Sequence, residues 1–138
     1  MSLCEDVLYT DELQFGFKKA RSCTDAIFTL RTAVSHFSAK GSTVYLAALD
    51  IKKAFDSVNH NKLFNCLLLR GVPICIINVL RDWYSKLFVR VKWGTALSEV
   101  AMVSCGVRQG GVISPVLFNV FSNVFINRLR SLYKLDVM

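Results

Sequence analysis

The sequence predicts an α/β or α+β domain, with one layer of mixed sheet and helices packed on it. Residues 44–50 form a continuous apolar run that ends on Asp50, which is typical of a strand buried on both faces. Residues 113–125 carry apolar side chains at the spacing of one helix face. Because segments of strand and helix character alternate along the chain, both kinds of element should share one fold.

The composition fits one domain with a sizeable core, since 53% of the 138 residues are apolar. The 17 Lys and Arg against 10 Asp and Glu give a net charge of +7. This surplus favours a polyanionic partner, either nucleic acid or an acidic membrane surface. Polar residues interrupt the most hydrophobic stretch, residues 112–129, so we expect no membrane span.

The five cysteines are odd in number, scattered, and contain no CxxC pair. They are expected to be reduced thiols rather than disulfides or a zinc site. The first six residues lack the basic and apolar regions of a signal peptide. We therefore expect an intracellular protein, nuclear or cytoplasmic and not secreted.

In the first half of the chain, the spacing predicts an amphipathic helix over residues 24–39, with Thr24 as N-cap and its apolar stripe in the core. The strand over residues 44–50 follows. An ionised Asp50 at its end requires compensation by a cap, a basic partner or a metal. The cap would belong to a short helix that begins at Ile51 or Lys52.

In the second half, residues 59–70 and 73–86 should form helices, with Gly71 as C-cap of the first and Pro73 in the first turn of the second. Residues 87–104 should form a half-exposed hairpin, whose Arg90 and Lys92 make a candidate basic surface beside Trp93.

Two loops are candidates for contact with phosphate. Residues 105–111 contain three glycines, an Arg and a Gln directly before the last helix. Residues 18–21 contain three positive charges, which are either a solvated surface or a phosphate contact.

Two motifs make the sequence resemble a known family. Residues 49–60 read LDIKKAFDSVNH, and residues 106–119 read GVRQGGVISPVLFN. These stretches resemble the first catalytic motif and the nucleotide-and-template motif of reverse transcriptases, most closely those of non-LTR (LINE-type) retrotransposons. The resemblance covers residues 14–129 and implies part of a right-hand polymerase, with a palm sheet, packed helices and part of the fingers.

The resemblance implies two-metal nucleotidyl transfer, in which two Mg²⁺ (or Mn²⁺) ions stabilise the attacking and leaving oxygens. Asp50 would be the catalytic metal-binding carboxylate, and the Ile51 carbonyl a further ligand. The implied partners are an RNA template, a DNA primer and deoxynucleoside triphosphates.

The resemblance also implies the residues that bind the nucleotide. Phe55 would lie under the sugar and exclude a 2′-hydroxyl, although it could instead be an ordinary core residue. Gln109 and Gly110 would contact the incoming nucleotide and the template. Arg21 matches a basic fingers position only loosely, and Asp56 is expected to form local hydrogen bonds.

The second catalytic motif, an aromatic residue followed by an Asp-Asp pair, has no counterpart, because only Asp136 follows Glu99 among the acidic residues. We therefore expect residues 1–138 to be one partial, truncated domain without a thumb, inactive in isolation. The alternatives are a non-catalytic basic nucleic-acid-binding remnant, a group II intron type polymerase, and a structural domain whose charge aids solubility.

Overall fold

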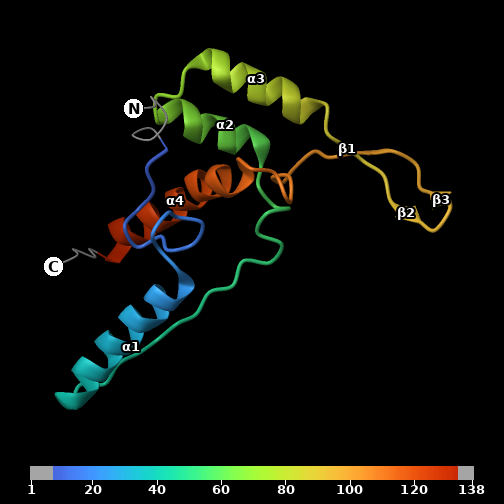
Figure 1. Ribbon diagram of the computed structural model, residues 1–138. Coiled ribbons are helices and arrows are strands. Elements are labelled where there is room, and N and C mark those ends of the chain that lie inside the picture. Colours follow the sequence, from blue (N-terminus) through green and yellow to red (C-terminus); the bar gives the residue numbers. More distant parts are fainter. Residues whose placement is uncertain (1–7, 134–138) are drawn as a thin grey trace.

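The computed structural model describes residues 8–133 and contains helices and short strands. The helices are α1 (Cys23–Ala39), α2 (His60–Leu69), α3 (Ile74–Ser85) and α4 (Ser114–Tyr133). The strands are β1 (Phe88–Val89), β2 (Lys92–Trp93), β3 (Ala96–Leu97) and β4 (Ala101–Met102). Figure 1 shows α2, α3 and α4 close together, with α1 and the strands projecting away from them in different directions.

The core lies where α2 packs against α3 and α4. Three of the four apolar residues predicted to face inward from α2 are buried, whereas Leu68 is exposed. Burial of each such side chain contributes about 1.5–3 kcal/mol, so this three-helix contact supplies most of the stability. The buried apolar side chains are Val58, Leu63, Phe64, Leu67, Val72, Ile77, Tyr84, Val107, Leu117 and Val120.

Local signals set the limits of α2 and α3. The Asn59 side chain accepts a hydrogen bond from the Lys62 amide at 3.0 Å and caps α2. Gly71, with φ of +79°, follows the helix in the left-handed conformation that glycine tolerates. Pro73 directly precedes α3. The predicted positions of these two helices are confirmed, but Arg70 rather than Gly71 is the C-cap of α2, and Pro73 is the N-cap of α3 rather than a residue of its first turn.

The predicted central strand is wrong. Residues 44–50 form no strand, and all of them except Val44 are exposed, with Leu49 at 74%. A strand buried on both faces needs neighbouring strands, and no other segment in residues 8–133 pairs with this one. The described residues are therefore a mixture of helices and small sheets, as in an α/β fold, but they do not form a sheet layer.

The predicted helix over residues 24–39 forms as α1, but its apolar stripe is not in the core. It buries no residue, and Ile27 is 65% exposed, because no other described helix or strand packs against it. The N-cap also lies two residues earlier than predicted. Ser22, not Thr24, accepts from the Asp25 amide at 3.2 Å, and the Asp25 carboxylate accepts from the Ser22 amide at 2.8 Å.

The predicted hairpin forms a projecting arm, which we define as residues 87–103 (Figure 1). β1 pairs with β4 and β2 with β3, both antiparallel, and the turn between β2 and β3 begins at Gly94, with φ of +59°. Phe88 faces Met102 and Lys92 faces Leu97, so the second strand contains one extra residue, a β-bulge. All side chains from 88 to 102 are exposed, so the expectation of a half-exposed hairpin is wrong.

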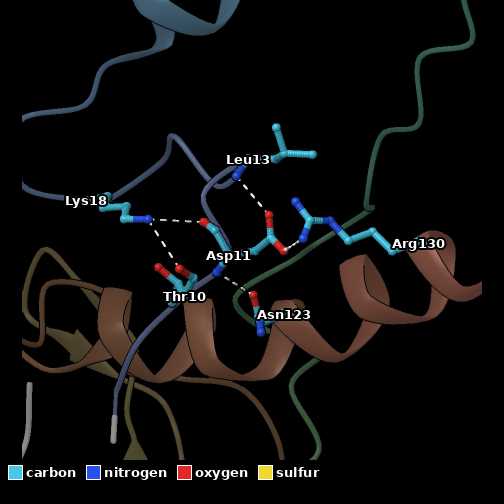
Figure 2. A network of polar contacts seen from close by, with 6 residues as sticks. All are labelled: Thr10, Asp11, Leu13, Lys18, Asn123 and Arg130. Carbon is cyan, nitrogen blue, oxygen red and sulfur yellow. Dashed lines mark hydrogen bonds and ion pairs between the residues drawn. The ribbon is translucent and has the colours of Figure 1, made fainter. Parts of the chain in front are cut away.

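The segment before α1 is attached to α4 by polar contacts (Figure 2). The buried Asp11 carboxylate pairs with Arg130 Nη1 at 3.1 Å, and the Asp11 amide donates to Asn123 Oδ1 at 2.8 Å. Lys18 Nζ donates to the carbonyls of Thr10 at 3.2 Å and Asp11 at 3.1 Å. Lys18, one of the three positive charges in residues 18–21, therefore has a structural role.

Two other expectations can be compared with this structure. Cys23, Cys66, Cys75 and Cys105 are free thiols, whereas Cys4 lies outside the described residues, as do Asp136 and the first six residues. None of the helices between residues 8 and 133 combines the length and apolar character that crossing a bilayer requires.

Candidate functional site

The structure brings together the two motifs that the sequence singled out, here called the first segment (residues 49–60) and the second segment (residues 106–119). The Gly106 amide donates to the Val58 carbonyl at 2.7 Å, and the Val107 amide donates to the Phe55 carbonyl at 2.8 Å. His60 Nε2 lies 2.8 Å from the Gly106 carbonyl oxygen. Because a carbonyl oxygen only accepts, this ring nitrogen carries a proton.

Gly106 permits this close approach. A Cβ atom at this position would lie 2.9 Å from the Asp56 Cα and 3.0 Å from the Asp56 carbonyl oxygen. The φ of Gly106 is +94°, a value that side chains disfavour. The backbones of the two segments can therefore meet here only because residue 106 lacks a side chain.

Phe55 is half-buried in an aromatic cluster. Its ring stacks on Phe118 from α4, with centroids 4.7 Å apart and planes at 20°. The edge contact with Phe17 has a centroid distance of 5.5 Å and an angle of 88°. Such contacts are worth about 0.5–1.5 kcal/mol each beyond area burial, so they hold the Phe55 ring in one orientation.

Gln109 and Asp56 connect the two segments at the surface. Gln109 Nε2 donates to Asp56 Oδ1 at 3.0 Å, and both residues are exposed. Asp56 therefore forms the local hydrogen bond that the sequence led us to expect. Gly110, which follows Gln109 in the second segment, has φ of +79°, and nothing lies within 4 Å of the position that a Cβ atom would take.

Asp50 and Ile51 lie apart from these contacts. Both are exposed, and within residues 8–133 no hydrogen bond or ion pair reaches the Asp50 carboxylate. The short helix that Asp50 could have capped is absent, because residues 52–57 form turns. The described part of the chain has no group of three His, Cys, Asp or Glu side chains that could hold a metal ion. These residues alone do not fit a two-metal site.

Arg21 lies outside the two segments. Its guanidinium lies over the Phe15 ring at 5.6 Å from the centroid, and the side chain is exposed. In the described residues no hydrogen bond joins it to either segment. The structure thus joins the backbone of Phe55 to the loop that carries Gln109 and Gly110, and Gln109 bonds to Asp56, the residue after Phe55. Among the described residues, no hydrogen bond or ion pair joins the side chains of Arg21 or Asp50 to this loop.

The sequence reasoning missed three side chains of this site: Phe17, Phe118 and His60. Phe118 and His60 lie inside the two motifs, but an apolar or aromatic residue in a helix pattern gives no sign of its contact partner. Phe17 could not be found either, because its φ of +52° and its position depend on the polar contacts that attach its segment to α4.

Comparison with known proteins identifies the family. The model of the reverse transcriptase (RNA-dependent DNA polymerase) family matches residues 4–137, nearly the whole chain. The chain therefore belongs to the reverse transcriptase family, which confirms the resemblance drawn from the two motifs. No solved structure matches the chain significantly.

Several relatives are proteins of transposable elements. The chain is 28% identical over 121 residues to the retrovirus-related Pol polyprotein from the type-2 retrotransposable element R2DM of Drosophila melanogaster, covering 88% of this chain and 11% of that protein. It is 29% identical over 119 residues to the Pol polyprotein of element R2 from Nasonia vitripennis, covering 86% and 12%. A third relative, a probable RNA-directed DNA polymerase from the transposon X-element of Drosophila melanogaster, is 28% identical over 125 residues, covering 89% and 13%. The chain spans about a tenth of the length of these relatives.

Proposed function

We propose that this chain is part of an RNA-directed DNA polymerase and forms one side of the site for the incoming nucleotide. The observation that supports this proposal is the contact between the two segments, where Gly106 and Val107 hydrogen-bond to Val58 and Phe55 at 2.7 and 2.8 Å. This contact brings the backbone of Phe55 next to the loop that carries Gln109. The family resemblance gives nucleotide contacts to both of these side chains.

In this proposal Phe55 selects deoxynucleotides. Its ring would lie under the sugar, where a 2′-hydroxyl would clash with it. Selection of this kind needs a ring that cannot turn aside, and Phe118 and Phe17 hold the ring on two sides. Gln109 offers an amide for hydrogen bonding, and Gly110 allows close approach of a base or sugar.

Asp50 would supply one carboxylate ligand and Ile51 a carbonyl. A divalent metal ion bound there would polarise phosphate oxygens. Since residues 8–133 contain no group of ligands that could hold it, we expect the purified 138-residue chain to extend primers little or not at all. Mg²⁺-dependent extension by this chain that Asp50→Asn abolishes would contradict this expectation.

The nucleotide proposal can be tested by NMR titration of the isotope-labelled chain with dTTP or UTP. We expect dTTP to shift the amide signals of Phe55, Gln109 and Gly110 and to bind more tightly than UTP. Phe55→Ala should remove that preference, while Phe28→Ala, an exposed aromatic residue on α1, should leave it unchanged. Shifts confined to α1 or to the arm would contradict the proposal.

A second candidate is a non-catalytic basic nucleic-acid-binding remnant of a retroelement. The lack of further ligand side chains that could hold a metal ion in residues 8–133 and the net charge of +7 favour it. This candidate predicts salt-dependent binding of nucleic acid without affinity for deoxynucleotides. The same titration therefore distinguishes the two. A group II intron type polymerase remains an alternative within the polymerase class, because it would use the same two segments.

A further inference from the structure

An open groove of about 830 Å³ lies between the end of α3, the base of the arm and the loop that precedes α4. Cavities of about 300–1,000 Å³ accommodate ligands of nucleotide size. The lining includes two aromatic side chains, Trp83 and Phe88, and two cations, Lys86 and Arg108. Trp83 is 42% exposed and Phe88 56%, so both rings are accessible to a ligand.

One end of the groove is the candidate nucleotide site. Asp56 and Gln109, joined by their hydrogen bond of 3.0 Å, form part of the lining. A ligand that follows the groove therefore reaches the point where the two segments meet.

The other end continues onto one face of the arm. The Ser98 amide donates to the Val91 carbonyl, and the Val91 amide donates to the Ser98 hydroxyl oxygen, at 2.9 Å each, so the two sides of the arm stay joined between β1 and β2. Because alternate side chains of an extended strand share a face, Arg90 and Lys92 lie on the same face as Phe88. The aromatic and basic character of the groove thus extends along the arm.

The charges facing this path are mostly positive. Lys86 pairs with Asp82 at 2.7 Å, where both side chains are well exposed and the pair is weak. Arg90, Lys92 and Arg108 form no ion pair with the described residues. The nearby carboxylates are Asp56, which accepts from Gln109, and Glu99 on the opposite strand of the arm.

We infer that this groove and the adjoining arm face bind single-stranded nucleic acid. Trp83 and Phe88 stack on bases, while Lys86 and Arg108, followed by Arg90 and Lys92, contact phosphates. Alternating aromatic and cationic side chains are the features that such binding requires. Identifying the strand as the template rests on the proposed function. The binding itself requires neither metal nor nucleotide, so each inference can fail separately.

Tryptophan fluorescence provides the first test, because the chain has two tryptophans. In Trp93→Phe the groove residue Trp83 is the only emitter, and a short oligouridylate should quench it in a saturable way. In Trp83→Phe the only emitter is Trp93, which is 85% exposed on the arm, and quenching should be weak. The opposite pattern, or no quenching in either variant, would overturn the inference.

Fluorescence anisotropy with a labelled oligouridylate tests the individual contacts. Phe88→Ala, at an exposed position, should weaken binding about tenfold. The double variant Lys86→Gln, Arg108→Gln should flatten the dependence of log K on log salt by about 1.4. A matched double variant, Arg31→Gln on α1 with Lys40→Gln at its C-cap, should leave both quantities unchanged. Equal losses in the two double variants would mean diffuse charge attraction and would overturn the inference.

The same assays test the binding of single-stranded nucleic acid separately from the polymerase proposal. Oligouridylate and oligothymidylate should both bind, because stacking and phosphate contacts are common to RNA and DNA. Oligonucleotide binding in the groove without deoxynucleotide binding at Phe55 would support this inference and contradict the polymerase proposal. Deoxynucleotide binding without quenching of Trp83 would do the reverse.

Discussion

At the scale of single residues, Gly106 determines whether the two segments can touch. Its Cβ position is occupied by the backbone of Asp56, and its φ of +94° is unfavourable for other residues. Gly110 has a similar φ of +79°, but nothing lies within 4 Å of its Cβ position. Substituting each glycine by alanine therefore separates the free-energy cost of backbone strain, which both positions have, from the cost of steric contact, which only position 106 has.

We predict that Gly106→Ala lowers the free energy of unfolding by about 2–4 kcal/mol, because strain and overpacking add. Gly110→Ala should cost only the strain, about 1 kcal/mol. Urea denaturation of both variants measures the difference. Equal losses would mean that the close contact between Gly106 and Asp56 does not exist in solution.

Tyr84 provides a prediction on pH. Burial raises the pKa of its phenol, so the folded protein holds the proton more tightly than the unfolded chain. Its contribution is therefore fully present below the unfolded pKa of about 10 and is lost as pH rises through the folded pKa. Urea midpoints between about pH 9 and 11 should fall less steeply in Tyr84→Phe than in the native chain.

A residual slope should remain in Tyr84→Phe, because burial also raises the pKa of the Cys66 thiol. Identical slopes in the native chain and Tyr84→Phe would show that the phenol is not desolvated in the folded state.

At the scale of elements, a buried ion pair is among the contacts that attach the segment before α1 to α4. The Asp11 side chain is 5% exposed and pairs with Arg130 at 3.1 Å, so removing the carboxylate leaves a cation without its partner. Asp11→Ala should lower the free energy of unfolding by about 2–3 kcal/mol. The exposed pair of Asp82 and Lys86 is the control, and Asp82→Ala should cost under about 1 kcal/mol. A loss from Asp11→Ala as small as the control's would contradict the arrangement in Figure 2.

Elements with local signals could be predicted from the sequence. Asn59, Gly71 and Pro73 set the limits of α2 and α3, and Gly94 sets the turn of the arm. The N-cap of α1 was predictable too, because Ser22 followed by Asp25 is a capping-box pattern that we overlooked. The absence of a strand over residues 44–50 and the exposure of α1 could not be predicted, since an apolar pattern does not reveal whether a packing partner is present.

The candidate site could be predicted only in part, because its motifs are local in sequence but the contacts between them are not. The motifs indicated which segments matter, and the two segments do meet, through the backbone of Phe55 and the side chain of Asp56. The partners that orient them, Phe118, Phe17 and Asp56, depend on contacts between segments distant in sequence. Asp50 lies in the stretch whose predicted strand does not form, so its position could not be derived from the strand pattern.

At the scale of the whole molecule, the chain exposes an unusually large surface. Its accessible area is 11153 Å², whereas a folded monomer of this mass exposes about 7,200 Å². Much of the excess is apolar, in α1, residues 44–51 and the arm. A surface of this kind favours association with other apolar surfaces.

We therefore predict that the isolated chain self-associates and binds a hydrophobic dye, and that its solubility is poor. Sedimentation velocity over a range of concentrations, with dye fluorescence in parallel, measures both properties. The double variant Ile27→Lys, Leu30→Lys on α1 should reduce association, because these side chains are exposed. A monodisperse native monomer that binds no dye would contradict the exposed surface described here.

The most direct test of the polymerase proposal is primer extension by a chimera in which this chain replaces its matching segment in the R2DM polyprotein of Drosophila melanogaster. We predict Mg²⁺-dependent extension that Asp50→Asn abolishes and that the nearby control Lys52→Gln preserves. A folded chimera that binds template and primer without extending it, or one that remains active with Asp50→Asn, would contradict the proposal.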